Sequence, residues 1–208
     1  IMSSDWSSDV CSSDLRYYVT AGPVPRIVER FTELTGRHDL PPLWMLGYHQ
    51  CRWSYTPEAR VRKLAEDFKT HNVPCDAIYL DIDYMDGFRC FTWDRERFPT
   101  LAQLIRDLRD QGIKTVTMID PGIKKDPGYA VYHQGLESGH FCTLPDGEVF
   151  HAPVWLGLSA FPDFTAPATR AWWGQLYEPL LDMGIAGIWN DMNEPSAFTV
   201  PADRTLPD

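Results

Sequence analysis

The segment that decides the fold reads GIWNDMNEPS and runs from Gly187 to Ser196. It continues an apolar run that begins at Ile185 and ends abruptly in the carboxylate of Asp191. A strand buried on both faces is expected to be continuously apolar, and proline, which follows here at Pro195, is excluded from the middle of a sheet. The segment therefore predicts a buried parallel strand whose carboxyl end opens into a polar cleft.

Three earlier segments repeat this pattern of an apolar run that ends in a polar or acidic residue. We expect strands over residues 43–49, 77–80 and 114–119, which lead to His49, to Asp81 with Asp83, and to Asp120. Short apolar runs bounded by turn residues are typical of strands in parallel sheets. The carboxyl ends of parallel strands meet at one edge, so these side chains are expected to gather there.

Amphipathic segments alternate with these strands. Apolar residues at helical spacing predict helices over 25–34, 57–68 and 101–108, the second capped by Thr56. A further helix is expected after Thr165, kinked by Pro179 and ended by Gly184, and a hairpin is expected around residues 146–147. This alternation predicts an α/β fold with a parallel sheet.

Two architectures have this alternation, the (β/α)8 barrel and the open doubly wound sheet. No Gly-x-Gly-x-x-Gly fingerprint follows any expected strand, which weakens the dinucleotide-binding form of the open sheet. Acidic or polar strand ends favour the barrel, whose active sites lie at that face. We predict a partial TIM barrel, about the first four strand–helix units.

The chain is expected to have three parts. Residues 1–15 repeat Ser-Ser-Asp without helical or strand periodicity, and we interpret them as translated sequencing-adapter sequence or a disordered tail. Residues 16–42 are expected to form a linker and helix leading into the barrel. Residues 43–208 are expected to be the first half of a truncated barrel domain, whose partner would be the remaining half of its own barrel.

Composition narrows the classes of partner. The net charge of -10 and the pI of about 5.0 argue against nucleic acid or an anionic membrane. No apolar run is long enough to span a bilayer, and no signal peptide is visible. The five cysteines lack a Cys-x-x-Cys pair, which indicates free thiols in a reducing, cytoplasmic compartment.

The strand ends combine carboxylates with aromatic residues. The histidines show no paired metal-ligand spacing, no Gly-x-Ser-x-Gly elbow is present, and no cofactor or metal is expected. An Asp-only magnesium site at the acidic strand ends is the alternative, since carboxylates can hold a hard cation. Carboxylates that can bond hydroxyl groups, next to aromatic rings that can pack on C–H faces, suit a sugar. Glycoside hydrolysis uses a pair of carboxyl groups at the scissile bond.

A resemblance to a known family makes the interpretation as a glycoside-hydrolysing site more specific. Residues 189–196, WNDMNEPS, resemble the signature of family 31 glycoside hydrolases, the retaining α-glucosidase group. Residues 43–55 resemble that family's first barrel strand, residues 80–88 with 91–94 its second, and residues 118–123 its third. Residues 161–165 precede the fourth strand as they do there, and the likeness covers about residues 17–200.

The resemblance implies roles for individual residues. Asp191 resembles the catalytic nucleophile, and Asp81 resembles the carboxylate that binds sugar hydroxyls in the non-reducing-end subsite. Asp120 is expected to brace the same pocket, and Trp189 to line it or to pack beneath it. The remaining residues expected in the pocket wall are Trp53, Met118, Trp155 and Met192, and those expected to support the site are Glu194, Asp83 and His49.

The implied substrate is an oligosaccharide with a non-reducing-end α-glucose. A transglycosylase or an α-xylosidase could use the same nucleophile, and a third hypothesis is a non-catalytic fragment that only binds sugar. In the family the general acid lies on a later barrel strand, beyond residue 208. We therefore expect that these 208 residues alone hydrolyse glycosides poorly, and unpaired sheet edges also put their independent folding in doubt.

Overall fold

The computed structural model describes residues 17–193 and 197–198 of the chain. Contacts divide the chain between Pro41 and Pro42 into two units. In the first unit, α1 (Val24–Thr35) confirms the helix predicted over 25–34 and ends at Gly36, whose φ of 92° suits glycine. None of its residues is buried, and its apolar residues Val28, Phe31 and Leu34 are more than half exposed.

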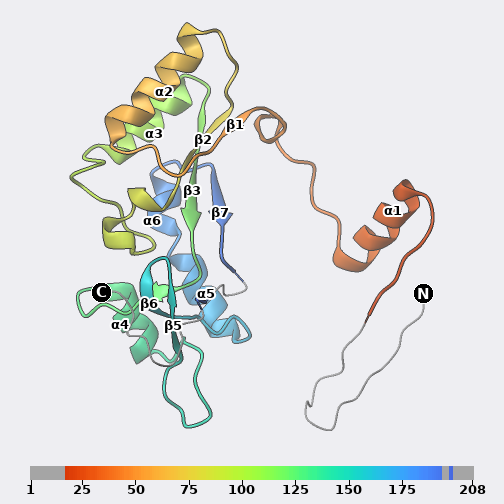
Figure 1. Cartoon of the computed structure of the whole chain (residues 1–208), viewed down its shortest axis with the longest axis vertical. Helices are drawn as coiled ribbons and strands as arrows, with labels where there is room; N and C mark the ends of the chain where they lie inside the picture. Colours follow the sequence, from red (N-terminus) through yellow and green to blue (C-terminus); the bar gives the residue numbers. More distant parts are fainter. Residues whose placement is uncertain (1–16, 194–196, 199–208) are drawn as a thin grey trace. The chain divides into compact units, whose positions relative to one another are not determined.

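The second unit is built on a parallel sheet with the strand order β1-β2-β3-β7. The strands are β1 (His49–Gln50), β2 (Ala77–Leu80), β3 (Lys114–Ile119) and β7 (Gly187–Asn190), and every neighbouring pair is parallel. The predicted parallel α/β sheet is confirmed (Figure 1). The final strand is only partly buried, however, and not enclosed on both faces as its apolar sequence suggests.

The first predicted strand is mostly wrong. Residues Leu43–Leu46 form a 3-10 helix, η1, and extended pairing is confined to His49 and Gln50. Pro42 holds φ at -62°, and the N–H of Gly47 closes the turn on Trp44 O. A short apolar run does not distinguish a strand from a helical turn, and here the preceding proline favours the turn.

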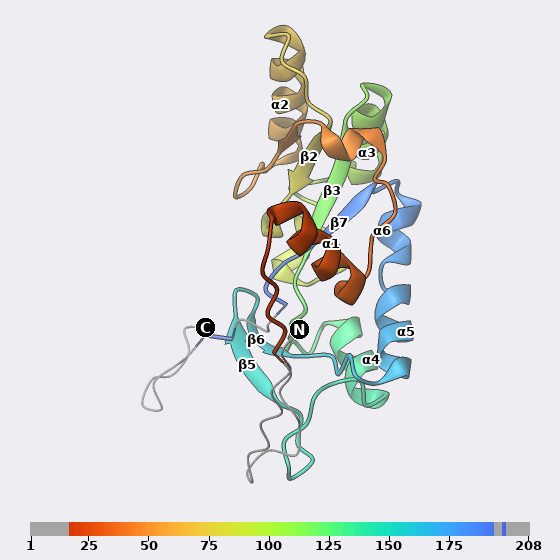
Figure 2. The same cartoon turned by 90° about the vertical axis from the view of Figure 1, so that its right-hand side faces the viewer.

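Two helices pack against each other, and the second of them also packs on β3. They are α2 (Glu58–Thr70) and α3 (Leu101–Asp110), and α3 buries Leu101, Leu104, Ile105 and Leu108 (Figure 2). The predicted helices are confirmed, but the Thr56 cap is wrong. Pro57 occupies the N-cap position, and the N–H of Glu58 instead donates to Arg97 O at 2.8 Å.

A second, antiparallel sheet is inserted between β3 and β7. Its strands are β4 (Ile123–Lys124), β5 (His151–Val154) and β6 (Gly157–Ala160), in the order β4-β6-β5, with α4 (Ala130–Glu137) preceding β5. It lies beyond the carboxyl ends of the parallel strands in both views (Figures 1 and 2). The predicted hairpin around Asp146–Gly147 is confirmed by an antiparallel bridge between Thr143 and Val149. A second hairpin, β5–β6, turns at Trp155 and Leu156.

The last helical segment is interrupted near Pro179 as expected, but the break lies at Leu176 and Tyr177, and Pro179 stands at the start of the second helix. The segment consists of α5 (Pro167–Gln175) and α6 (Glu178–Asp182), and Gly184 follows with φ of 99°. Thr165 does not cap α5, because its hydroxyl donates to Asp163 Oδ1 at 2.6 Å and Ala166 holds the N-cap position. Two 3-10 turns, η2 (Ile82–Tyr84) and η3 (Asp86–Phe88), connect β2 to the segment before α3.

A buried carboxylate ties α2 to the start of α3. Glu58 is 6% exposed and accepts hydrogen bonds from Thr100 N at 2.9 Å, Thr100 Oγ1 at 2.6 Å and Arg62 Nη2 at 2.8 Å. Burial alone would raise the pKa of Glu58, but these hydrogen bonds outweigh burial and hold the pKa below its ordinary value of 4.5.

We expect Glu58→Gln to lower the free energy of unfolding by about 2 kcal/mol at neutral pH, because hydrogen bonds to a charged group contribute about 1.5–3 kcal/mol. Because folding lowers the pKa of Glu58, its charged form stabilises the folded chain at every pH above the pKa of the unfolded chain. The difference in free energy of unfolding between wild type and Glu58→Gln should therefore shrink as the pH falls below about 4.5. Urea denaturation of the chain measures both effects.

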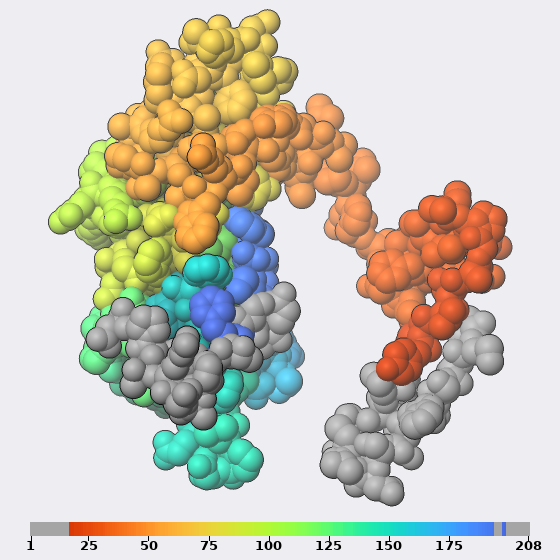
Figure 3. Space-filling view, viewed as in Figure 1, coloured from red at the N-terminus to blue at the C-terminus, as the bar shows by residue number. Residues whose placement is uncertain are grey.

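The matched control is Glu66→Gln, a position on α2, the helix whose gold-coloured surface is open to solvent in Figure 3. Its side chain is 65% exposed and pairs only with Lys63, so its removal should change stability by less than about 1 kcal/mol. Equal losses from the two variants would contradict the role given to Glu58.

Candidate active site

Three aspartates gather at the carboxyl ends of adjacent parallel strands. Asp81 follows β2, Asp120 follows β3, and Asp191 follows β7. Strand β3 lies between the other two, and Ile119 of β3 pairs in register with Asn190 of β7. The N–H of Asp191 donates to Ile119 O at 3.2 Å, which extends the pairing by one residue. The parallel register therefore brings the three carboxylates to one edge of the sheet.

A cleft of about 130 Å³ lies above these strand ends. Its walls come from the parallel strands, from the segment after β1, and from the β5–β6 hairpin. All of its lining residues except Ile82 are among the predicted site residues, and the full lining is Trp53, Asp81, Ile82, Met118, Asp120, Trp155, Trp189 and Asp191.

Asp81 is positioned by the turn that follows its strand. It is the N-cap of η2, and its Oδ1 accepts a hydrogen bond from Ile82 N at 2.7 Å. Burial, together with the charges of Asp191 and Asp83, raises its pKa above the ordinary value, although the bond from Ile82 opposes this shift. Ile82 was not predicted as a site residue, and its position directly after Asp81 is the signal that could have indicated it.

Asp120 is the most buried of the three aspartates, with an exposure of 2%. Within the described part of the chain its Oδ1 has no hydrogen-bond partner. Burial, and then the charges of Asp191 and Asp81, raise the pKa of Asp120 to about 7. Its carboxyl group can therefore remain protonated near neutral pH.

Asp191 is half-buried at the end of β7. The next residue, Met192, has a φ of 54°, in the left-handed region that non-glycine residues rarely adopt. Such backbone strain is concentrated at functional sites. Met192 is half-buried beside Asp191 but is not among the residues that line the cleft, and Glu194 lies outside the described residues.

Exposed aromatic rings border the mouth of the cleft. Trp53 and Trp155 are 65% and 53% exposed and meet edge to face, with ring centroids 5.5 Å apart. Trp155 also meets Phe198 at 5.2 Å. The β5–β6 hairpin carries Trp155 at its turn, so the inserted sheet serves to place this ring at the cleft. Phe198 was not predicted as a site residue, because no local motif marks it.

Asp83 contacts a residue of the cleft directly, and His49 is connected to the cleft only through Tyr79. Asp83 Oδ2 accepts a hydrogen bond from Trp53 Nε1 at 3.1 Å and therefore orients that ring. His49 lies 3.0 Å from the Tyr79 hydroxyl, and Tyr79 in turn packs edge to face on Trp189. Neither residue lines the cleft, in keeping with the supporting positions expected for both.

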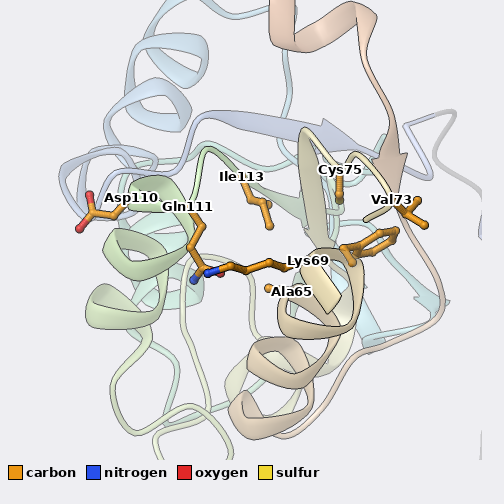
Figure 4. Close-up of a pocket in the computed structure, with 8 residues that line it drawn as sticks. Ala65, Lys69, Val73, Cys75, Asp110, Gln111 and Ile113 are labelled. Atoms are coloured by element: carbon orange, nitrogen blue, oxygen red, sulfur yellow. The ribbon is translucent and has the colours of Figure 1, made fainter. Parts of the chain in front are cut away.

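A larger pocket of about 380 Å³ lies elsewhere, near the amino ends of β2 and β3 (Figure 4). It is formed by the ends of α2 and α3 and by residues that precede the two strands, among them Lys69, Cys75, Asp110 and Ile113. It contains one carboxylate and no aromatic pair. In parallel barrels this end serves stability while chemistry occurs at the opposite end, so the smaller cleft is the candidate active site.

The described residues contain no group of three or more His, Cys, Asp or Glu side chains arranged to hold a metal ion. No helix among them is long and apolar enough to cross a membrane. Cys51, Cys75, Cys90 and Cys142 are unpaired, which confirms the prediction of free thiols for these four.

Residues 38–207 match the family model described as the glycosyl hydrolases family 31 TIM-barrel domain. The chain belongs to glycosyl hydrolase family 31. The resemblance and the partial TIM-barrel fold predicted from the sequence are thereby confirmed.

Similar proteins in this family are α-glucosidases. The chain is 54% identical over 183 residues to Alpha-glucosidase 2 of Bacillus thermoamyloliquefaciens. This alignment covers 88% of the chain and 23% of the relative. The chain is 40% identical to Neutral alpha-glucosidase C of Homo sapiens, covering 94% of the chain and 22% of the relative. The chain thus spans about a quarter of the length of these curated relatives.

Solved structures in the family share this fold. The Family 31 alpha-glucosidase from Bacteroides thetaiotaomicron aligns with a TM-score of 0.75 and 46% identity, over 82% of this chain and 29% of that one. The ER glucosidase II heterodimeric complex gives a TM-score of 0.80 and 38% identity, over 86% and 20% of the two chains.

The raised pKa of Asp120 predicts how the stability of the folded chain depends on pH. The unfolded chain releases this proton near pH 3.8 and the folded chain only near pH 7, so stability should fall as the pH rises between these values. Asp120→Asn removes the titration. We expect it to leave the melting temperature unchanged near pH 4 and to raise it by several degrees above about pH 7.

Thermal melts of the chain across this range test the prediction. Asp110→Asn, an exposed position at the end of α3, is the matched control. A constant offset of Asp120→Asn from wild type at every pH would contradict a raised pKa.

Proposed function

We propose that the intact protein is a retaining, exo-acting α-glucosidase with Asp191 as its nucleophile. The observation that carries the proposal is the position of Asp191, at the end of β7 and in one cleft with two further carboxylates and three tryptophans. The α-glucosidase names of the similar proteins support this substrate class.

The chemistry follows from this position. A carboxylate oxygen of Asp191 attacks the anomeric carbon, and the bond from that carbon to the leaving oxygen breaks. The leaving oxygen takes a proton from a general acid, which the family resemblance places on a later barrel strand. Water then attacks the anomeric carbon of the glycosyl–enzyme ester and gives its proton to the conjugate base of the general acid. The bond from that carbon to Asp191 breaks, the carboxylate is restored, and the sugar leaves with its anomeric configuration retained.

The other cleft residues would select the sugar. Asp81 is half-buried in the same cleft as Asp191 and presents its second oxygen, Oδ2, for sugar hydroxyl groups, since Oδ1 already accepts from Ile82. Charged acceptors of this kind bind hydroxyl groups strongly. The faces of Trp53, Trp155 and Trp189 offer apolar surface for the C–H groups of the ring. The proposed substrate is an oligosaccharide with a non-reducing-end α-glucose.

A fluorosugar tests the nucleophile directly. We expect 5-fluoro-α-glucosyl fluoride to add one glycosyl group to the protein, mapping by mass spectrometry to the peptide that contains Asp191. Fluoride leaves with little help from an acid, so this step isolates the nucleophile. Asp191→Asn should abolish the label, and Asp110→Asn, remote from the cleft, should retain it.

The experiment is made on the chain and on a chimera in which the chain replaces the matching segment of Alpha-glucosidase 2. Labelling at another carboxylate in the folded chimera, or none at all, would refute the nucleophile. A parallel reaction with the xylosyl analogue distinguishes an α-xylosidase, and analysis of products in the presence of maltose distinguishes a transglycosylase.

Asp81→Ala should weaken binding of glucose by about 10- to 100-fold, because hydrogen bonds to a charged group contribute about 1.5–3 kcal/mol. Calorimetric titration of the chimera with glucose measures the change. Asp110→Ala is the control, and an unchanged affinity in the Asp81 variant would show that this carboxylate does not contact the sugar.

A further inference from the structure

The pairing of β3 with β7 makes Asp120 and Asp191 lateral neighbours. Ile119 and Asn190 are register partners, and the hydrogen bond from Asp191 N to Ile119 O continues the ladder. Neighbouring strands lie about 4.8 Å apart, and residues at matched positions point to the same face. Both side chains accordingly line the same cleft.

Asp120 differs from the other two aspartates in its surroundings. Asp81 and Asp191 are half-buried, but Asp120 is 2% exposed, and its Oδ1 lacks a partner among the described residues. Buried polar atoms are almost always hydrogen-bonded in folded proteins. The unpaired Oδ1 is therefore free to hold a proton and to donate it to a neighbouring group of the same cleft.

No described positive charge compensates Asp120. It forms no ion pair with the lysines, arginines and histidines of the described ranges. The titratable groups that face it are Asp81 from β2, Asp191 from β7, and Tyr84 and Cys90 from the connection after β2.

Neither Tyr84 nor Cys90 changes its charge in the working range. The Tyr84 hydroxyl donates to Met118 O at 3.1 Å, and burial raises its pKa. The Cys90 thiol donates to the backbone oxygen of Asp120 at 3.3 Å, and burial raises its pKa to about 12. Both remain neutral, so the charge of this edge depends on the aspartates alone.

Two adjacent carboxylates with no cation between them share a proton, because a like charge at this distance disfavours a second ionisation. We propose that Asp120 is a positioning residue that holds this proton and donates it in a hydrogen bond to Asp191, so that the nucleophile stays ionised. This inference rests on the proposed function of Asp191.

The difference in burial decides which aspartate carries the proton. Ionisation is most costly for the carboxyl that is most removed from water, which is Asp120. The half-buried Asp191 retains contact with solvent and can hold the negative charge. Burial and the neighbouring charges of Asp191 and Asp81 raise the pKa of Asp120 to about 7, in agreement with this assignment.

The proton is not consumed in the reaction. When Asp191 attacks, its electron pair forms the ester bond to the anomeric carbon, and Asp120 keeps its proton. The hydrogen bond from Asp120 then supports the departing carboxylate when water hydrolyses the ester. Asp120 thus acts through Asp191 and forms no bond to the sugar.

Infrared spectroscopy tests the protonation state without any turnover. We expect the carbonyl band of a neutral carboxylic acid in the wild-type protein near pH 6, and its loss as the pH rises above about 7. Asp120→Asn should abolish that band, and Asp110→Asn should retain it. Absence of the band in the folded wild type, or its persistence in Asp120→Asn, would overturn the proposal.

The second test compares two substitutions in the fluorosugar reaction. Asp120→Ala removes the donor and should move the acidic limb of the labelling-rate profile upward by about one pH unit, or about tenfold in rate at a fixed pH on that limb. Asp120→Asn keeps an N–H donor and should retain the wild-type limb. If Asp120 had only a structural role, its substitution would lower the labelling rate at every pH without moving the acidic limb of the profile.

The outcomes separate this inference from the proposed function. If Asp191 is not labelled in the wild-type protein, the assignment of Asp191 as the nucleophile is wrong. If it is labelled but the limb stays in place in Asp120→Ala, or moves downward in both variants, the proton-holding role is wrong. Should Asp120→Ala fail to fold in the chain, the comparison is made in the chimera with Alpha-glucosidase 2, where the same outcomes apply.

Discussion

The in-register pairing of β3 with its two neighbours is the constraint on which the site depends. Because β2, β3 and β7 run parallel, the residues after their last paired positions emerge at one edge. A shift of one residue in any strand would turn its aspartate to the opposite face of the sheet. Apolar contacts on the helix side hold the register, and α3 buries four large side chains there.

The strand ends were predictable because they have a local signature. Residues 77–80 and 114–119 are apolar runs followed by an aspartate, and the structure ends both strands where the sequence analysis did. The family motif around Asp191 added the chemistry. The side-chain types at the strand ends, together with the family motif, were enough to predict most of the residues that line the cleft.

Other features depend on contacts that a local pattern does not contain. The run after Pro42 is as apolar as a strand, yet it turns because a proline precedes it and a short sheet contact follows. The inserted sheet of β4, β5 and β6 was missed, since its strands have two to four residues each and β4 pairs with β6 across about 35 residues of sequence. The burial of Asp120 away from water and from cations likewise depends on segments that are distant in the sequence, so no local pattern predicts it.

The exposed pair of Trp53 and Trp155 gives the protein an optical property. Their rings meet at the mouth of the cleft, while the described tryptophans outside this pair are at least partly shielded from solvent. A molecule that enters the cleft must displace water from these two indoles before it reaches the carboxylates. The intrinsic fluorescence of the protein, and its accessibility to a soluble quencher, should therefore report occupancy of the cleft without any added dye.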